Sequence, residues 1–110
     1  MSQVIWIIVN CNSIEEATSI GNEMLKKRII GCFDVYPRHL AAYFWPPKSE
    51  KIETAKGAML ILETFDDNYD SISKEVKNLH SDDLPFVGYT EMKGISEEYL
   101  NWMNGELIKK

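Results

Sequence analysis

Hydrophobic and polar positions change their spacing several times along the chain. The first segment, residues 3–10, is rich in Ile, Val and Trp, which is typical of a buried central strand. It is followed by Ser13 and Glu16, the S-x-x-E pattern of a helix N-terminus, and then by apolar residues at three- and four-residue spacing. The pattern predicts an amphipathic helix that fades near residues 28–30, with Gly31 as its stop.

Residues 32–64 predict one long β-hairpin. Aromatic and β-branched residues dominate residues 32–45, but Pro37 interrupts them. Because proline has no N–H to donate to a sheet, we expect this strand to be bent, bulged or at an edge around Pro37. Residues 46–49 predict a turn, and a strand pattern resumes over residues 50–64. The hairpin is longer than the core of one domain needs, so we expect it to find a partner.

A second helix and a short strand follow the hairpin. We expect Asp66 or Asp67 to cap this helix. Residues 80–85 form a polar connection, residues 86–92 alternate as a short strand, and Gly94 ends it. The apolar residues of the helix recur three or four positions apart: Tyr69, Ile72, Val76 and Leu79.

The chain closes with a third predicted helix, which Ser96 is expected to cap. Glutamates in its first turn and the lysines Lys109 and Lys110 at its end both suit the helix dipole. Its apolar face is expected to consist of Tyr99, Trp102, Met103 and Leu107.

The predicted order is strand–helix–strand–strand–helix–strand, plus the C-terminal helix. It indicates a single α+β domain, residues 1–110, with a ferredoxin-like antiparallel sheet. We expect two helices on one face of this sheet and a long hairpin between its second and third strands. This architecture serves many functions, so it does not by itself name one.

Composition narrows the classes of partner. The chain has 110 residues, 45% of them hydrophobic and 26% charged, as in ordinary soluble globular domains. Its net charge is −5 and it has no clustered basic surface beyond residues 26–28 at a helix end, which argues against a nucleic acid partner. It has neither a run of about 20 apolar residues nor an export signal, so we expect a cytoplasmic protein with no membrane partner. In that compartment Cys11 and Cys32 would stay reduced, although a disulfide between them remains open.

Candidate chemistry is limited to metal ligation. The dinucleotide, P-loop, esterase and zinc-protease motifs are absent, so we expect no enzyme. Thiol, imidazole and carboxylate groups could hold copper, zinc or a harder cation. Their spacing matches no structural zinc motif, and each also has an ordinary explanation as a packed or solvent-facing residue. The candidates are Cys11, Cys32, His39, His80, Asp82 and Asp83.

The aromatic residues of the hairpin point to an interface. Tyr43 and Trp45 share one face of the predicted strand, Phe44 lies on the other, and Tyr36 precedes them. If the hairpin extends beyond the domain, these rings are either exposed or covered by another subunit. Burial in the core of the same domain is the alternative.

Several segments together resemble the CutA family, named for divalent-cation tolerance. The most specific are residues 79–85 (LHSDDLP), similar to the family's L-H-P-Y-E/D-x-P, and residues 98–102 (EYLNW), similar to its D/E-Y-L-x-W. Residues 43–45 (YFW) are similar to its Y-x-W. Weaker likenesses are found at residues 25–32, 51–53 and 62–64.

The resemblance implies a homotrimer of ferredoxin-like domains that pack through long hairpins and edge strands, as in the PII signalling proteins. It also implies copper binding and metal tolerance, with Cys32 among the suggested ligands. The alternative is a PII-like sensor or scaffold that binds a small molecule or a partner protein at the cleft between subunits.

Departures from the family pattern favour a cation over an anion. Glu63 stands where the family has lysine, Asp34 where it has asparagine and Asp82 where it has tyrosine, while Pro46 and Pro47 replace a glycine after the tryptophan. If these carboxylates converge with Asp83, they would favour a bound cation.

Overall fold

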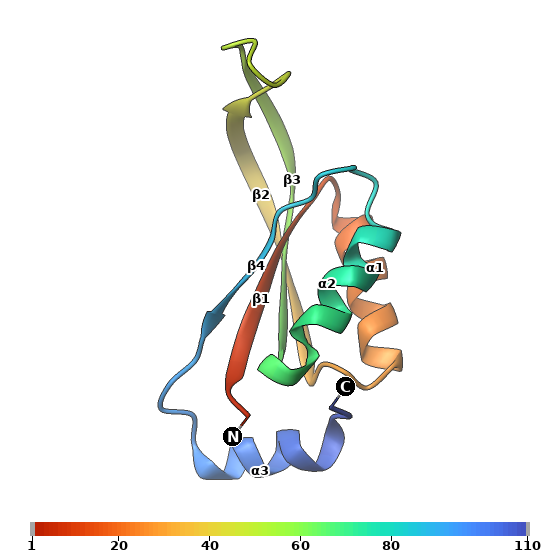
Figure 1. Ribbon diagram of the computed structural model, residues 1–110, viewed down its shortest axis with the longest axis vertical. Coiled ribbons are helices and arrows are strands. Elements are labelled where there is room, and N and C mark those ends of the chain that lie inside the picture. Colours follow the sequence, from red (N-terminus) through yellow and green to blue (C-terminus); the bar gives the residue numbers. More distant parts are fainter. Residues whose placement is uncertain (1, 110) are drawn as a thin grey trace.

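The computed structural model describes residues 2–109, which form an antiparallel sheet with helices (Figure 1). The α+β, ferredoxin-like order predicted from the sequence is confirmed. The strands are β1 (Val4–Cys11), β2 (Cys32–Phe44), β3 (Ile52–Phe65) and β4 (Val87–Glu91). The helices are α1 (Ile14–Lys26), α2 (Tyr69–Leu79) and α3 (Glu97–Glu106), and a short 3-10 turn, Asp66–Asn68, precedes α2.

The sheet has the order β2-β3-β1-β4, so β1 is central and β2 is an edge strand. Pro37 therefore lies in an edge strand, where its missing N–H costs least. Just after it, the pairing shifts from Arg38 opposite Gly57 to Ala41 opposite Ala55, which inserts one extra residue into β2. The bulge and the edge position predicted around Pro37 are both confirmed.

One face of the sheet forms the core. Helices α1 and α2 lie along this face (Figure 1). Paired residues of β1 and β3, such as Ile7 with Leu62 and Val9 with Leu60, are fully buried beneath them. Strand side chains alternate between faces, so Trp6 and its partner Glu63 lie on the opposite face. That face carries the first candidate site.

The first helix begins as predicted and ends earlier. The Ser13 hydroxyl accepts a hydrogen bond from the Glu16 N–H at 3.0 Å, which confirms the N-cap. The helix ends at Lys26, and Arg28 rather than Gly31 takes the left-handed backbone conformation, with φ of 58°. Gly31 instead allows the Leu107 side chain to pack closely against the backbone, since a Cβ at residue 31 would lie 3.1 Å from Leu107 Cδ1.

The predicted cap of α2 was wrong. The Asp66 carboxylate accepts a hydrogen bond from the Gln3 N–H at 3.0 Å, across 63 residues. Residue Asn68 precedes the helix without a capping side-chain bond, and its amide donates to the Ile29 carbonyl oxygen at 3.0 Å. Long-range contacts thus use the polar groups that local spacing assigned to the cap.

Helix α3 packs against the end of the sheet opposite the hairpin tip (Figure 1). Ser96 caps it as predicted, but it ends at Glu106, so Lys109 lies beyond its last turn, and Lys110 lies outside the described residues. Of the predicted apolar face only Met103 is fully buried. Tyr99 and Trp102 remain exposed and pack on each other, with ring centroids 5.3 Å apart.

The β2–β3 hairpin extends well beyond the core (Figure 1), and the molecule measures 47 × 26 × 22 Å. The rings of Tyr36, Tyr43, Phe44 and Trp45 are all exposed, with Phe44 at 72%. Burial of these rings in the core of the same domain is therefore excluded.

Candidate functional site

The metal-ligand candidates do not form one site within a single chain, because Cys32 lies apart from the others. Cys32 begins β2, whereas His39 lies in the bulge seven residues further along, about 23 Å away at strand spacing. His80, Asp82 and Asp83 follow α2, at the end of the sheet from which the hairpin projects. Within one chain, the structure groups His80 with Asp82 and separates both from Cys32.

The two cysteines are also apart, which answers whether they form a disulfide. Cys11 pairs with Ala58 and Cys32 with Glu63, positions on β3 about 17 Å from each other. Both thiols are free.

Cys32 lies beside two carboxylates. Its thiol is 3.9 Å from Asp34 Oδ2, and Glu63 is its cross-strand partner. Partial burial raises the pKa of the Cys32 thiol, and the negative charges of Asp34 and Glu63 raise it further. The same charges would attract a cation, and a bound cation would displace the thiol proton.

Glu63 is held in place by two donors that sequence reasoning missed. The Trp6 indole N–H donates to Glu63 Oε2 at 3.0 Å, and the Tyr99 hydroxyl donates to Oε1. The bond to Glu63 raises the pKa of Tyr99 well above its usual value of 10. Each carboxylate oxygen keeps a free lone pair, so Cys32, Asp34 and Glu63 offer one sulfur and two oxygen donors of the kind that soft or borderline cations accept.

A second cluster joins Cys11, Glu16 and His80, whose potential ligand atoms lie within 4.8 Å of one another. Glu16 was assigned only to the helix cap, although its carboxylate also accepts hydrogen bonds from the N–H groups of Asn12 and Ser81, both at 2.9 Å. Burial would raise the pKa of Glu16, but these bonds outweigh it and the pKa is lowered. Burial, together with Glu16, raises the pKa of Cys11 to about 12.

Both ring nitrogens of His80 are occupied. Its Nδ1 accepts a hydrogen bond from the Asp82 N–H at 2.9 Å, so the ring proton is on Nε2, which donates to the Asn10 carbonyl at 2.7 Å. The His80 side chain is buried. This arrangement argues against His80 as a metal ligand and gives it the role of fixing the following loop to β1.

That loop borders a hollow of about 660 Å³ at the base of the hairpin. Its polar lining includes Arg38, Asn12, Asp82 and Asp83, and its aromatic lining includes Tyr43, Trp45 and Phe86.

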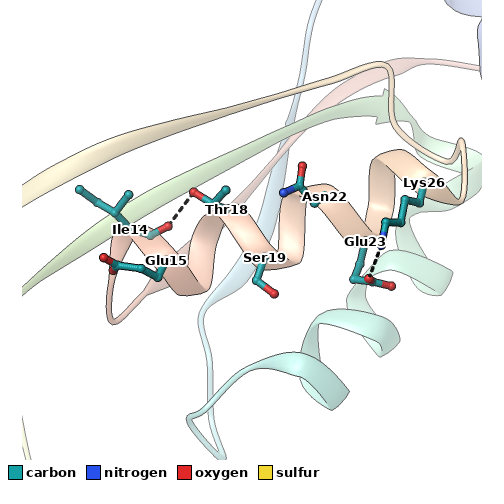
Figure 2. A pocket seen from close by; sticks show the side chains of 7 residues that line it. All are labelled: Ile14, Glu15, Thr18, Ser19, Asn22, Glu23 and Lys26. Carbon is teal, nitrogen blue, oxygen red and sulfur yellow. Dashed lines mark hydrogen bonds and ion pairs between the residues drawn. The ribbon is translucent and has the colours of Figure 1, made fainter.

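A second hollow, of about 500 Å³, follows the outer face of α1 (Figure 2). Two of its polar groups are paired within the helix: Lys26 with Glu23 at 3.5 Å, and the Thr18 hydroxyl with the Ile14 carbonyl at 2.8 Å. We therefore take this face as ordinary helix surface.

Comparisons with known proteins agree with this architecture. Residues 5–106 match the family model described as CutA1 divalent ion tolerance protein. The divalent-cation tolerance protein CutA of Pyrococcus horikoshii is 32% identical over 95 residues, which cover 86% of this chain and 89% of that protein. The crystal structure of CutA1 from P. horikoshii superposes with a TM-score of 0.86 at 30% identity, covering 96% of this chain and 99% of that one.

Two further structures share the fold. CutA1 from Oryza sativa has a TM-score of 0.90 at 22% identity, covering 98% of this chain and 96% of that one. A protein described as the periplasmic divalent cation tolerance protein CutA from Archaeoglobus fulgidus has a TM-score of 0.87 at 25% identity, covering 94% and 97%. Within residues 2–109, no helix is both long and apolar enough to cross a membrane. These matches describe tolerance of divalent ions, and the chain belongs to the CutA1 divalent ion tolerance family.

Proposed function

We propose that this protein contributes to divalent-cation tolerance by binding a soft or borderline cation, with copper as the first candidate, at Cys32. The observation that carries the proposal is the partly buried thiol of Cys32, with Asp34 beside it and Glu63 opposite. A thiolate favours copper and zinc over hard cations, and the two carboxylates add the negative charge that a divalent ion needs.

The other candidate ligands contribute to this site only across a subunit boundary. Because His39, Asp82 and Asp83 lie far from Cys32 in one chain, they reach it only from a neighbouring copy. The proposed assembly is a homotrimer. It is supported by the exposed aromatic residues of the hairpin and by the unpaired edge of β2.

We further propose a cytoplasmic location, in which both free cysteines stay reduced. The relative from A. fulgidus is described as periplasmic, so the location needs its own test. Cell fractionation decides it: the proposal expects the protein with cytoplasmic markers, and recovery with periplasmic markers contradicts it.

The metal role is tested by calorimetric titration of the reduced protein with Cu(I) and with Cu(II). We expect Cys32→Ala to lose the binding heat and Asp34→Asn to bind about tenfold more weakly. Cys11→Ala is the matched control, because its thiol lies elsewhere in the fold and should not change the curve. An unchanged titration of Cys32→Ala would remove Cys32 from the account.

A second candidate function is a PII-like sensor or scaffold that binds a small molecule or a partner protein. The observation that favours a small molecule is the hollow beside Arg38, which has charges of both signs and aromatic walls. A ligand that binds only the folded state raises its apparent stability, so a thermal-shift screen compares metals with metabolites. A shift with metabolites and none with metals would favour this function over the first.

A further inference from the structure

The hollow at the base of the hairpin is a built pocket. Its volume of about 660 Å³ is within the range of small-molecule sites. Four parts of the chain line it: the end of β1 with Asn10 and Asn12, β2 around its bulge, Ala55 of β3, and the loop after α2 from Ser81 to Phe86.

The bulge in β2 brings the lining together. Arg38 pairs with Gly57 and Tyr43 with Glu53, positions four residues apart on β3 and thus on the same face. Without the extra residue, Tyr43 would lie on the opposite face from Arg38. The extra residue therefore places Tyr43 on the same face of β2 as Arg38.

Among the residues that the structure describes, the charge of Arg38 is unpaired. Its Nε is buried without a hydrogen-bond partner among the residues that the structure describes, and over the same residues Arg38 forms no ion pair. A buried donor left unpaired costs free energy, so the protein gains when a ligand supplies an acceptor. Gly57 makes room for this group, since a Cβ at that position would lie 2.7 Å from Arg38 Nη2.

The opposite charges of the pocket are on a fixed loop. Asp82 Oδ1 accepts a hydrogen bond from the Asn12 side-chain amide at 2.9 Å, and the Asp82 N–H donates to His80. Asp83 lines the pocket next to it. The His80 and Glu16 bonds therefore hold a carboxylate pair at the border of the hollow before any ligand arrives.

We propose that this pocket binds a free amino acid with an apolar or aromatic side chain. Arg38 would take the carboxylate in a bidentate bond, and Asp82 and Asp83 would take the ammonium group. Leu84 and Phe86, which lie outside the hairpin, would cover the side chain. One positive and two negative lining charges suit a dipolar molecule, whereas a nucleotide or another multiply charged anion would be repelled.

The inference deepens the sensor function proposed above and does not depend on a metal at Cys32. It is tested by calorimetric titration of the whole protein with L-phenylalanine up to roughly 10 mM, enough to saturate a site with a Kd of about 1 mM. We expect saturable binding that weakens about tenfold or more for N-acetyl-L-phenylalanine, which lacks the ammonium group. Binding of the methyl ester, which lacks the carboxylate, should be weaker by a similar factor.

Variants separate the roles of the residues. We expect Arg38→Met to abolish binding of L-phenylalanine without lowering the melting temperature of the free protein, because the variant removes an unpaired buried donor. Asp82→Asn should reduce the affinity for L-phenylalanine more than the affinity for its N-acetyl derivative. Glu15→Gln, on the outer face of α1 in Figure 2, is the matched surface control and should bind as the parent does.

Any of four results would overturn the inference. Three come from titration: no saturable heat with L-phenylalanine or other apolar amino acids, equal binding of the acid and its ester, or unchanged binding by Arg38→Met. The fourth is dissociation of the oligomer in Arg38→Met, which would show that a neighbouring subunit is the partner of Arg38. Copper titration of Arg38→Met and phenylalanine titration of Cys32→Ala keep the two functions distinguishable, since each should match the parent.

Discussion

The Asp82 N–H donates a hydrogen bond to His80 Nδ1 at 2.9 Å, which fixes the tautomer of a buried imidazole. The second nitrogen, Nε2, then donates to the Asn10 carbonyl oxygen at 2.7 Å. One side chain thus ties the loop after α2 to the end of β1, and it does so with no nitrogen left for a metal ion.

This relationship predicts the effect of His80→Ala. The variant leaves the Asn10 carbonyl and the Asp82 N–H without their partner and opens a cavity, so we expect a loss of about 2–4 kcal/mol in the free energy of unfolding. Urea denaturation measures it. Copper binding by the folded variant should match that of the parent, and a large loss of copper affinity would return His80 to the list of ligands.

Because the Tyr99 hydroxyl donates to the Glu63 carboxylate, we expect the stability effects of substitutions at these two residues to be coupled. Tyr99→Phe removes a bond to a charged acceptor at a partly exposed position, so we expect a cost of about 1 kcal/mol. Glu63→Lys removes the acceptor of both Trp6 and Tyr99 and should cost about 2 kcal/mol. A double-mutant cycle between Glu63→Gln and Tyr99→Phe checks the contact, and strict additivity of the two losses would contradict it.

The lowered pKa of Glu16 predicts how its contribution to the free energy of unfolding depends on pH. Its pKa in the folded protein is below the ordinary value of 4.5, so its contribution to stability is complete above pH 4.5 and is lost as pH falls through the folded pKa. We therefore expect Glu16→Gln to be less stable than the parent at pH 7, with the difference shrinking below pH 4.5. Unfolding free energies measured across this range test the sign, and a difference that grows on acidification would refute it.

Gly57 is expected to tolerate no side chain. A Cβ there would lie 2.4 Å from the Cys11 carbonyl oxygen, a backbone atom that cannot move aside cheaply. We expect Gly57→Ala to destabilise by about 1–3 kcal/mol. Gly105→Ala in α3 is the control, since its Cβ meets nothing within 4 Å and should stabilise the helix by about 0.5–1 kcal/mol. Equal melting temperatures for the two variants would contradict this account.

Local patterns predicted the elements well because each depends on near neighbours in the sequence. The Ser13 cap and the irregularity at Pro37 follow from hydrogen-bonding groups that can be read position by position. The prediction failed at Asp66, whose carboxylate bonds to residue 3 rather than to its own helix. Spacing cannot show that competition, because it arises only when distant strands meet.

The candidate sites were predictable only in part for the same reason. Cys32 was singled out as a residue, but its association with Glu63 depends on the register of β2 on β3. The Glu16–His80 cluster joins residues 64 positions apart, and Glu16 had a sufficient local role as a helix cap. Arg38 Nε has no hydrogen-bond partner within residues 2–109, and this shows only in three dimensions, because a single arginine in a strand carries no signal in the sequence.

The central claim is that the aromatic hairpin is covered by other copies of the chain. Light scattering of the purified protein after size exclusion tests it most directly. We expect three times the chain mass of 12.7 kDa, reduced to a smaller species by Phe44→Asp with the secondary structure preserved. A single-chain mass that persists at high protein concentration would contradict the proposed trimer.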